Sequence, residues 1–341
     1  MKIVLANIDY QSHTTSEGNE LQKGLARAGW VLCGRGYAES DQDVPGLMRR
    51  HRPEAVFVQD KRDWDPCNAG SFRKDVGFTD LNFLAEMTKP PIRIAVLKDA
   101  GTRKAYQESY IREEVGADAL VVYYHERSVL EQCPWLKDMK LIRIYHSVDR
   151  EIVDALDLTK ARKRAVLSGA MARSVYPIRK MAHANRHRLG IDWIQHPRHG
   201  NTGCHTPRYL AQLAGYRVHV ATASVFGFAL RKIIESVAVG CTPVTDLPEY
   251  DVLPEIDEAL VRVPLACTPD ELREAIERAD KSWELEERLR FSRLALAWYD
   301  WRQAGLRLSK AIEALVEPKH GPTKPVMPMA RRRRLVHKFS R

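Results

Sequence analysis

Short apolar runs alternate with helix-like segments through both halves of the chain, and this alternation constrains the fold more than any other feature of the sequence. Strand, helix and strand in succession form the repeating unit of a parallel sheet. Several runs are apolar at consecutive positions, which indicates strands covered on both faces. The first half therefore predicts a doubly wound sheet with strands at 2–8, 30–36, 55–60, 92–98, 119–125 and 141–146.

The same pattern begins again after the polar stretch REIVDALDLTKARKR. Further strands are expected at 165–170, 191–195, 217–222, 242–246 and 259–263. The 341 residues are enough for two domains that each bury a core. We predict an α/β architecture of two Rossmann-like domains, at 1–155 and 156–317, followed by a basic disordered tail at 318–341.

Two helix starts are marked by their first residues. Thr268 is a good N-cap, Pro269 suits the first helical position, and Glu271 completes the capping-box pattern. This predicts a helix over 269–280, and a weaker Thr-Pro start predicts another over 207–214.

Composition limits the class of protein. A membrane span needs about eighteen consecutive apolar residues, and no run in the sequence approaches this length. The N-terminus enters a strand without a secretory segment, so we expect a cytoplasmic protein. The six cysteines form no CxxC pair, which favours reduced thiols over disulfides.

The net charge of +10 is concentrated at one end of the chain. Eight lysines and arginines and no acidic residue lie between 319 and 341, and in the rest of the chain the charges nearly balance. The tail can therefore contact polyanions, whereas the folded body has no basic bias.

The first strand–helix turn has the features of an anion site. A helix that begins near 16–18 would present unpaired backbone N–H groups, and Gly18 would allow a ligand to approach closely. The turn lacks a GxGxxG pattern, so a polar loop before a capped helix is the alternative.

The expected second domain opens with the same construction. Ser168 and Gly169 end the strand, and Pro177 suits the first turn of a helix. Arg173 and Arg179 can pair with phosphate oxygens, which predicts a diphosphate site. The alternative is a surface loop with solvated arginines.

The segment 226–250 carries the most information. A helix over 230–239 would place Arg231 or Lys232 in its first turn and Glu235 one turn later. A base and a carboxylate at one helix end can hold a phosphate and a ribose. Gly240 then ends the helix.

This segment resembles the C-terminal domain of the group 1 glycosyltransferases of the GT-B fold, especially the branch of spore-maturation glycosyltransferase-like proteins. The hallmark is a basic residue, then Glu, then Ala-x-Gly and a Pro-Val-like strand. The resemblance extends through LSGAMARSVYPIRK and ERLRFSRLALAWYDWRQAGLRLSKAIEAL, and more weakly through Gly18, Gly24 and Ala28-Gly29-Trp30.

The resemblance implies roles for four residues. Glu235 would bind the donor ribose, and Lys232 or Arg231 would reach the diphosphate with support from Arg179. The donor would be a nucleotide diphosphate sugar, a UDP-sugar in our prediction, with no bound cofactor and no metal.

The resemblance also implies that the last helices cross back to the first domain and bury Trp298 and Trp301. One position departs from the family pattern. Many retaining relatives carry two glutamates on either side of a seven-residue spacer; Glu235 matches the second, but Gly227 occupies the place of the first. The stereochemical outcome therefore stays open.

An inverting enzyme also needs a general base for the acceptor hydroxyl. His13, Asp60 and Asp99 each follow an expected strand of the first domain, where ligands of doubly wound folds bind. We predict Asp99 or His13 as the base, with capping or solvated side chains as the alternative.

Metal-like patterns are weak. The cluster His196, His199, Cys204 and His205 lacks the paired spacing of structural zinc sites. The DxD strings at 41–43 and 63–65 are short enough to occur by chance.

The predicted function is transfer of a sugar to an acceptor hydroxyl, on a cell-envelope glycan or on a hydroxylated DNA base. Two alternatives stay open: another nucleotide-sugar enzyme such as an epimerase, and a nucleic-acid-binding protein that uses the arginines at 331–334.

Overall fold

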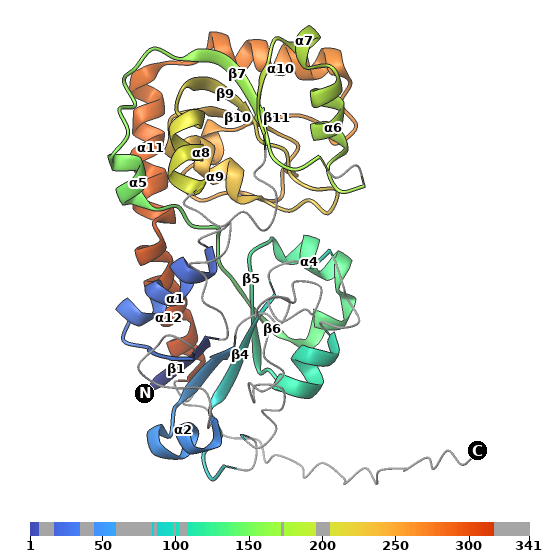
Figure 1. Ribbon diagram of the computed structural model, residues 1–341. Coiled ribbons are helices and arrows are strands. Elements are labelled where there is room, and N and C mark those ends of the chain that lie inside the picture. The colour runs from blue at the N-terminus through green and yellow to red at the C-terminus, as the bar shows by residue number, and fades with distance from the viewer. Residues whose placement is uncertain are drawn as a thin grey trace, which may run out of the picture.

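The strands of the chain form two parallel sheets, each in its own lobe (Figure 1). The computed structural model describes residues 1–6, 17–34, 44–58, 84, 87–97, 100–101, 108–171, 174–195 and 205–316. The predicted fold class, two doubly wound α/β units, is confirmed. The predicted boundary at 155 falls between the last strand of the first sheet and the first strand of the second, and it stays a prediction.

The first sheet has the strand order β2-β1-β3-β4-β5-β6, with every neighbouring pair parallel. Its strands β3 and β5 are buried at every position, as their consecutive apolar residues predict. The strands are β1 Lys2–Ala6, β2 Val31–Gly34, β3 Ala55–Val58, β4 Ile92–Leu97, β5 Ala119–Val122 and β6 Lys140–Arg143.

The second sheet has the order β11-β10-β9-β7-β8 and is also parallel. The central strands β7, β9 and β10 therefore end side by side at one edge. The strands are β7 Lys163–Ser168, β8 Asp192–Ile194, β9 Tyr216–Val220, β10 Thr242–Thr245 and β11 Val261–Arg262.

Helices connect the strands in both sheets (Figure 1). The predicted capping box begins α10: Thr268 Oγ1 accepts a hydrogen bond from the N–H of Glu271, and the Glu271 carboxylate accepts one from the N–H of Thr268. The described α-helices are α1 Glu17–Arg27, α2 Val44–His51, α4 Glu126–Gln132, α5 Arg150–Asp154, α6 Pro177–Ala184, α7 Arg186–Leu189, α8 His205–Leu213, α9 Arg231–Ala238, α10 Pro269–Lys281, α11 Leu285–Tyr299 and α12 Trp301–Val316.

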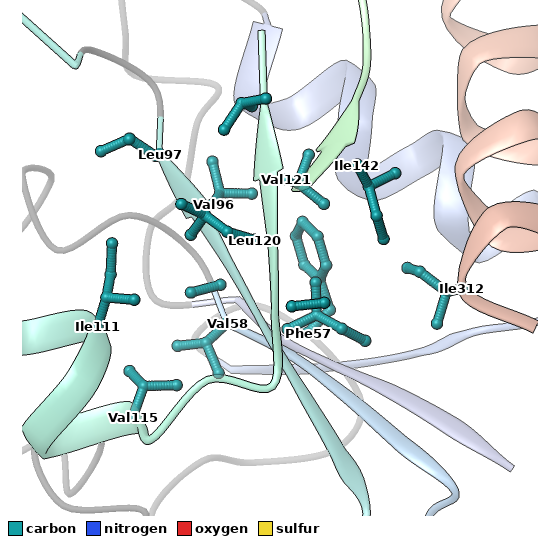
Figure 2. Close-up of a cluster of buried hydrophobic side chains, with 14 of the residues drawn as sticks. Phe57, Val58, Val96, Leu97, Ile111, Val115, Leu120, Val121, Ile142 and Ile312 are labelled. Carbon is teal, nitrogen blue, oxygen red and sulfur yellow. The ribbon is translucent and has the colours of Figure 1, made fainter. Parts of the chain in front are cut away.

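The last two helices cross from the second lobe to the first, as predicted (Figure 1). Helix α11 packs on α9, and α12 packs on α1. Ile312 of α12 belongs to the apolar core of the first lobe and lies near Phe57 and Ile142 in Figure 2. The C-terminal helices therefore complete the core of the N-terminal sheet.

The prediction that Trp298 and Trp301 are buried is wrong, because each is only partly buried. Both side chains are half-buried, and Tyr299 between them is the fully buried residue. The guanidinium groups of Arg307 and Arg302 lie 4.4 Å and 4.3 Å from the ring centroids of Trp298 and Trp301. The stacked guanidinium groups therefore cover one face of each ring in place of apolar core residues.

The chain passes between the lobes twice, after β6 and again between α11 and α12, and backbone hydrogen bonds join these two passages. The N–H of Val148 donates to the carbonyl of Tyr299 at 2.9 Å, and the N–H of Trp301 donates to the carbonyl of Val148 at 3.2 Å. These bonds tie the connection after β6 to the junction between α11 and α12.

In the described part of the chain, no helix has the length and apolar character needed to cross a membrane. The described cysteines Cys33, Cys133, Cys241 and Cys267 are all buried.

Candidate functional site

Polar and charged side chains gather at the carboxyl edge of the second sheet. The strands β7, β9 and β10 all end there, and the segments that follow them lead into α6 and α9 and to Asp246. In open parallel sheets, ligands bind outside the carboxyl ends of the strands. The geometry of this edge therefore defines the candidate site.

Lys232 lies in the first turn of α9, whose N-cap Leu230 offers no capping side chain. Its ammonium group sits 4.3 Å from the ring centroid of Tyr209. Within the part of the chain that the structure describes, no carboxylate forms an ion pair with Lys232, although Arg231 has two. Burial lowers the pKa of Lys232 to about 8, an effect that the nearby Glu235 opposes. An anion would stabilise this ammonium.

Arg179 is the second cation at the same edge, and it is buried. Its Nε donates to Thr222 Oγ1 at 3.1 Å, and its two terminal nitrogens donate to the carbonyls of Ala170 and Thr222. The Tyr176 ring centroid lies 3.8 Å from its Cζ. Burial lowers the pKa of Arg179. The guanidinium thus fixes the ends of β7 and β9 and supplies positive charge there.

Gly169 brings these two cations together. It follows β7 with φ +110°, a conformation that other residues rarely adopt. A Cβ at this position would lie 2.7 Å from Nη1 of Arg179 and 3.1 Å from Cε of Lys232. Glycine is therefore required here both by the backbone and by the close approach of the two side chains.

Ser168 joins a buried chain of hydrogen bonds instead of facing a ligand. The Ser236 hydroxyl donates to the carbonyl of Lys232, so its oxygen can accept from Nδ1–H of His219. Nε2 of His219 then accepts from Ser168 at 2.9 Å, and Ser168 accepts from Tyr209 at 3.0 Å. Burial holds the pKa of His219 well below its ordinary value, so the ring is neutral. The Ser168 hydroxyl thus positions α9 against β7, and the binding of a ligand by Ser168 stays a prediction.

Glu235 and Arg231 are paired with each other. Nε of Arg231 donates to Glu235 Oε1 at 3.0 Å, and its Nη2 donates to Glu20 Oε1 at 2.9 Å. Of the two bases that the sequence offered for a diphosphate, Arg231 is already held by two carboxylates. Lys232 is therefore the better candidate.

Sequence reasoning missed four residues of this region. Asp246 is buried, its Oδ1 accepts from the N–H of Ala223 at 2.6 Å, and burial raises its pKa. Its place at the end of an expected strand was a usable signal. His219, Tyr209 and Glu20 gave none, because they meet the site only through tertiary packing.

Other predicted residues fall elsewhere. Gly18 lies in the first turn of α1, which begins at Glu17 as expected. The predicted bases His13 and Asp99, and also Arg173, lie outside the described residues. Asp60, the histidines and cysteine at 196–204 and both DxD strings lie outside them too. Among the described residues, no three His, Cys, Asp or Glu side chains are grouped to hold a metal ion.

Two parallel-sheet lobes with C-terminal helices that cross back define the GT-B fold, which the motif resemblance predicted. No protein-family model matches the chain, and no curated protein matches it. The membership in the spore-maturation branch stays a prediction.

Solved structures with this fold cover almost the whole chain. A sucrose-phosphate synthase from Thermosynechococcus elongatus is similar at 13% identity and a TM-score of 0.54, over 92% of this chain and 98% of that one. A glycosyltransferase from Rickettsia africae ESF-5 is similar at 10% identity and a TM-score of 0.54, over 93% and 98%. An alpha-glucosyltransferase in complex with UDP and a 13-mer DNA with a central A:G mismatch gives the same four values. The TM-scores establish the fold alone, because the sequence identities are only 10–13%.

Proposed function

We propose that this protein transfers a sugar from a nucleotide diphosphate sugar to an acceptor hydroxyl. The observation that carries the proposal is the pair of cations, Lys232 and Arg179, that meets at Gly169 beside the first turn of α9. The neighbouring Glu235 adds a buried carboxylate one turn further along the helix.

The charges match a sugar-linked diphosphate. Such a group carries about two negative charges, and Lys232, Arg179 and the amino end of α9 offset them. Charge grows on the diphosphate as the bond to the sugar breaks, so the same groups stabilise the departing nucleotide. Lys232 would contact a phosphate oxygen, whereas the enclosed Arg179 would act mainly through its charge.

Glu235 suits the ribose. One of its oxygens accepts from Arg231, and a carboxylate can accept several hydrogen bonds, so hydroxyl donors can still be bound. At Gly227, where retaining relatives carry a further glutamate, φ is +67°, and a Cβ would lie 3.0 Å from Pro248 Cγ and 3.1 Å from the Tyr250 hydroxyl. A carboxylate contact to the sugar from that position is therefore absent in this chain.

The donor and acceptor can be proposed only by class. UDP is present in the complex of one structural neighbour, which supports a UDP-sugar donor. The acceptor would be a cell-envelope glycan or a hydroxylated DNA base, and the DNA in the same complex keeps the second class open. Asp99 or His13 would accept the proton of the acceptor hydroxyl.

We also propose that the reaction takes place in the cytoplasm. It should need no metal ion, because protein cations offset the diphosphate charge. Transfer measured with and without a chelator tests this: activity should be unchanged, and a loss that Mg²⁺ restores would contradict it.

The test of the function is a thermal-shift panel of UDP, GDP, ADP and TDP with their sugars, and NAD for comparison. We expect one nucleotide diphosphate to raise the melting temperature. The shift should vanish in Glu235→Ala and persist in Glu274→Ala, which changes an exposed glutamate of α10. A shift with NAD alone, or none at all, would contradict the proposal.

A further inference from the structure

Arg231 joins two buried carboxylates that come from different lobes. Glu235 lies one turn along α9 in the second lobe, and Glu20 lies in α1 beside the first sheet. The side chain of Arg231 is 12% exposed, and those of the two glutamates are each 6% exposed. Ion pairs shielded to this degree are screened little by salt, and loss of one partner leaves an uncompensated buried charge.

The Glu20 carboxylate is held at its other oxygen as well. Ser147 Oγ donates to Glu20 Oε2 at 2.6 Å. Ser147 lies in the connection between the sheets, next to Val148, which bonds to the junction of α11 and α12. Glu20 therefore links α1, the connection between the lobes and α9.

This arrangement makes the orientation of Glu235 depend on the first lobe. Two neighbouring carboxylates repel each other, and Arg231 holds both because its Nε and Nη2 each donate to one of them. Without the charge of Glu20, the guanidinium can turn fully toward Glu235 and occupy the oxygen that a ribose would use.

We propose that Glu20 is a positioning residue for the nucleotide: it holds Arg231 so that Glu235 keeps an oxygen free for the ribose. This inference rests on the proposed function. It makes donor binding in the second lobe depend on a side chain of the first lobe that does not itself touch the donor.

A second ion pair between the lobes provides a matched control. Arg143 of β6 donates to Asp251 at 2.5 Å, and the Asp251 side chain is fully buried. Asp251 follows β10 and makes no described contact with Glu20, Arg231 or Glu235. Asp251→Asn therefore weakens the junction of the lobes without altering the carboxylate that would bind the ribose.

The experiment measures the dissociation constant of UDP by calorimetry on the full chain. We expect Glu20→Gln to weaken UDP binding about tenfold, and Asp251→Asn to change it less than about twofold. In a Glu235→Gln background, Glu20→Gln should have little further effect, because Glu20 acts through Glu235. Ser147→Ala, which keeps every charge, should weaken binding about two- to threefold and serves if Glu20→Gln does not fold.

Each outcome bears on the inference. Equal losses in Glu20→Gln and Asp251→Asn, or additive losses with Glu235→Gln, would show a general loosening of the lobes and overturn it. UDP binding unaffected by both Glu20→Gln and Ser147→Ala would also overturn it while leaving the proposed function intact. If the unmodified protein binds no nucleotide, the proposed function fails and the role of Glu20 fails with it.

Discussion

Both sheets are parallel, yet their carboxyl edges differ in chemistry. At the edge of the second sheet, Lys232 and Arg179 meet at Gly169, and the Thr222 hydroxyl accepts a hydrogen bond from Arg179. In the described part of the first sheet, the end of β5 instead carries aromatic rings. Tyr124 stacks on Phe228 with ring centroids 3.9 Å apart, and Tyr123 stacks on His146 at 4.8 Å.

One segment takes part in both edges. The residues between β9 and α9 include Thr222, which accepts a hydrogen bond from Arg179. They also include Phe226 and Phe228, which pack into the core of the first lobe. One loop therefore joins the lobes by apolar packing and also places the amino end of α9. The packing between the lobes and the binding of an anion should therefore respond to different substitutions.

Phe228→Ala should have the largest effect. Phe228 is buried and stacked, so its removal should lower the free energy of unfolding by about 3–5 kcal/mol. Denaturant unfolding measures this loss. Val252→Ala, at a largely exposed side chain, is the control and should cost no more than about 0.5 kcal/mol. A loss below about 1 kcal/mol for Phe228→Ala would show that the loop does not join the lobes.

Lys232→Ala should affect binding rather than stability. Loss of a charge-assisted bond to a phosphate should weaken binding of the donor nucleotide by about 10- to 100-fold, measured by calorimetry. Lys180→Ala changes an exposed lysine of the neighbouring helix α6 and should leave the affinity unchanged. Equal nucleotide affinities of the Lys232→Ala and Lys180→Ala variants would show that the nucleotide does not bind at this edge of the sheet.

The affinity should also depend on pH. The pKa of Lys232 in the free protein is lowered to about 8, so its ammonium loses a proton as pH rises through this value. Only the protonated form attracts the diphosphate, so affinity should fall about tenfold between pH 7 and pH 9. Lys232→Arg keeps its charge over this range and should flatten the profile. A profile that is the same in both proteins would assign the titration to another group.

Thr268→Ala should have the smallest effect. It removes the side-chain cap of α10 and should lower the free energy of unfolding by about 1 kcal/mol. The nucleotide affinity should not change, because the described bonds of the Thr268 side chain go to Glu271 and not to Lys232, Arg179 or Glu235. A change in nucleotide affinity would contradict the expectation that the cap of α10 contributes to stability alone.

Much of this fold could be predicted because its signals are local. Consecutive apolar residues mark the strands, the Thr-Pro-x-Glu pattern marks the start of α10, and the spacing of Lys232 and Glu235 places both at one end of α9. These features depend on neighbours within a few residues, which sequence periodicity records.

The rest depends on contacts between distant segments. Glu20 and Arg231 are 211 positions apart, and the Ser168–His219 bond joins two strands. Trp298 and Trp301 look like core residues by composition, but stacking with nearby arginines leaves them half-buried. Hydrophobicity alone does not distinguish these cases.

A crystal structure of the protein with UDP would test the diphosphate site at Lys232 and Glu235 most directly. We predict that the diphosphate lies at the carboxyl edge of the second sheet, with an oxygen within hydrogen-bond distance of Lys232 Nζ and the ribose hydroxyls on Glu235. UDP bound in the first lobe, or bound without contact to Lys232 and Glu235, would contradict the account.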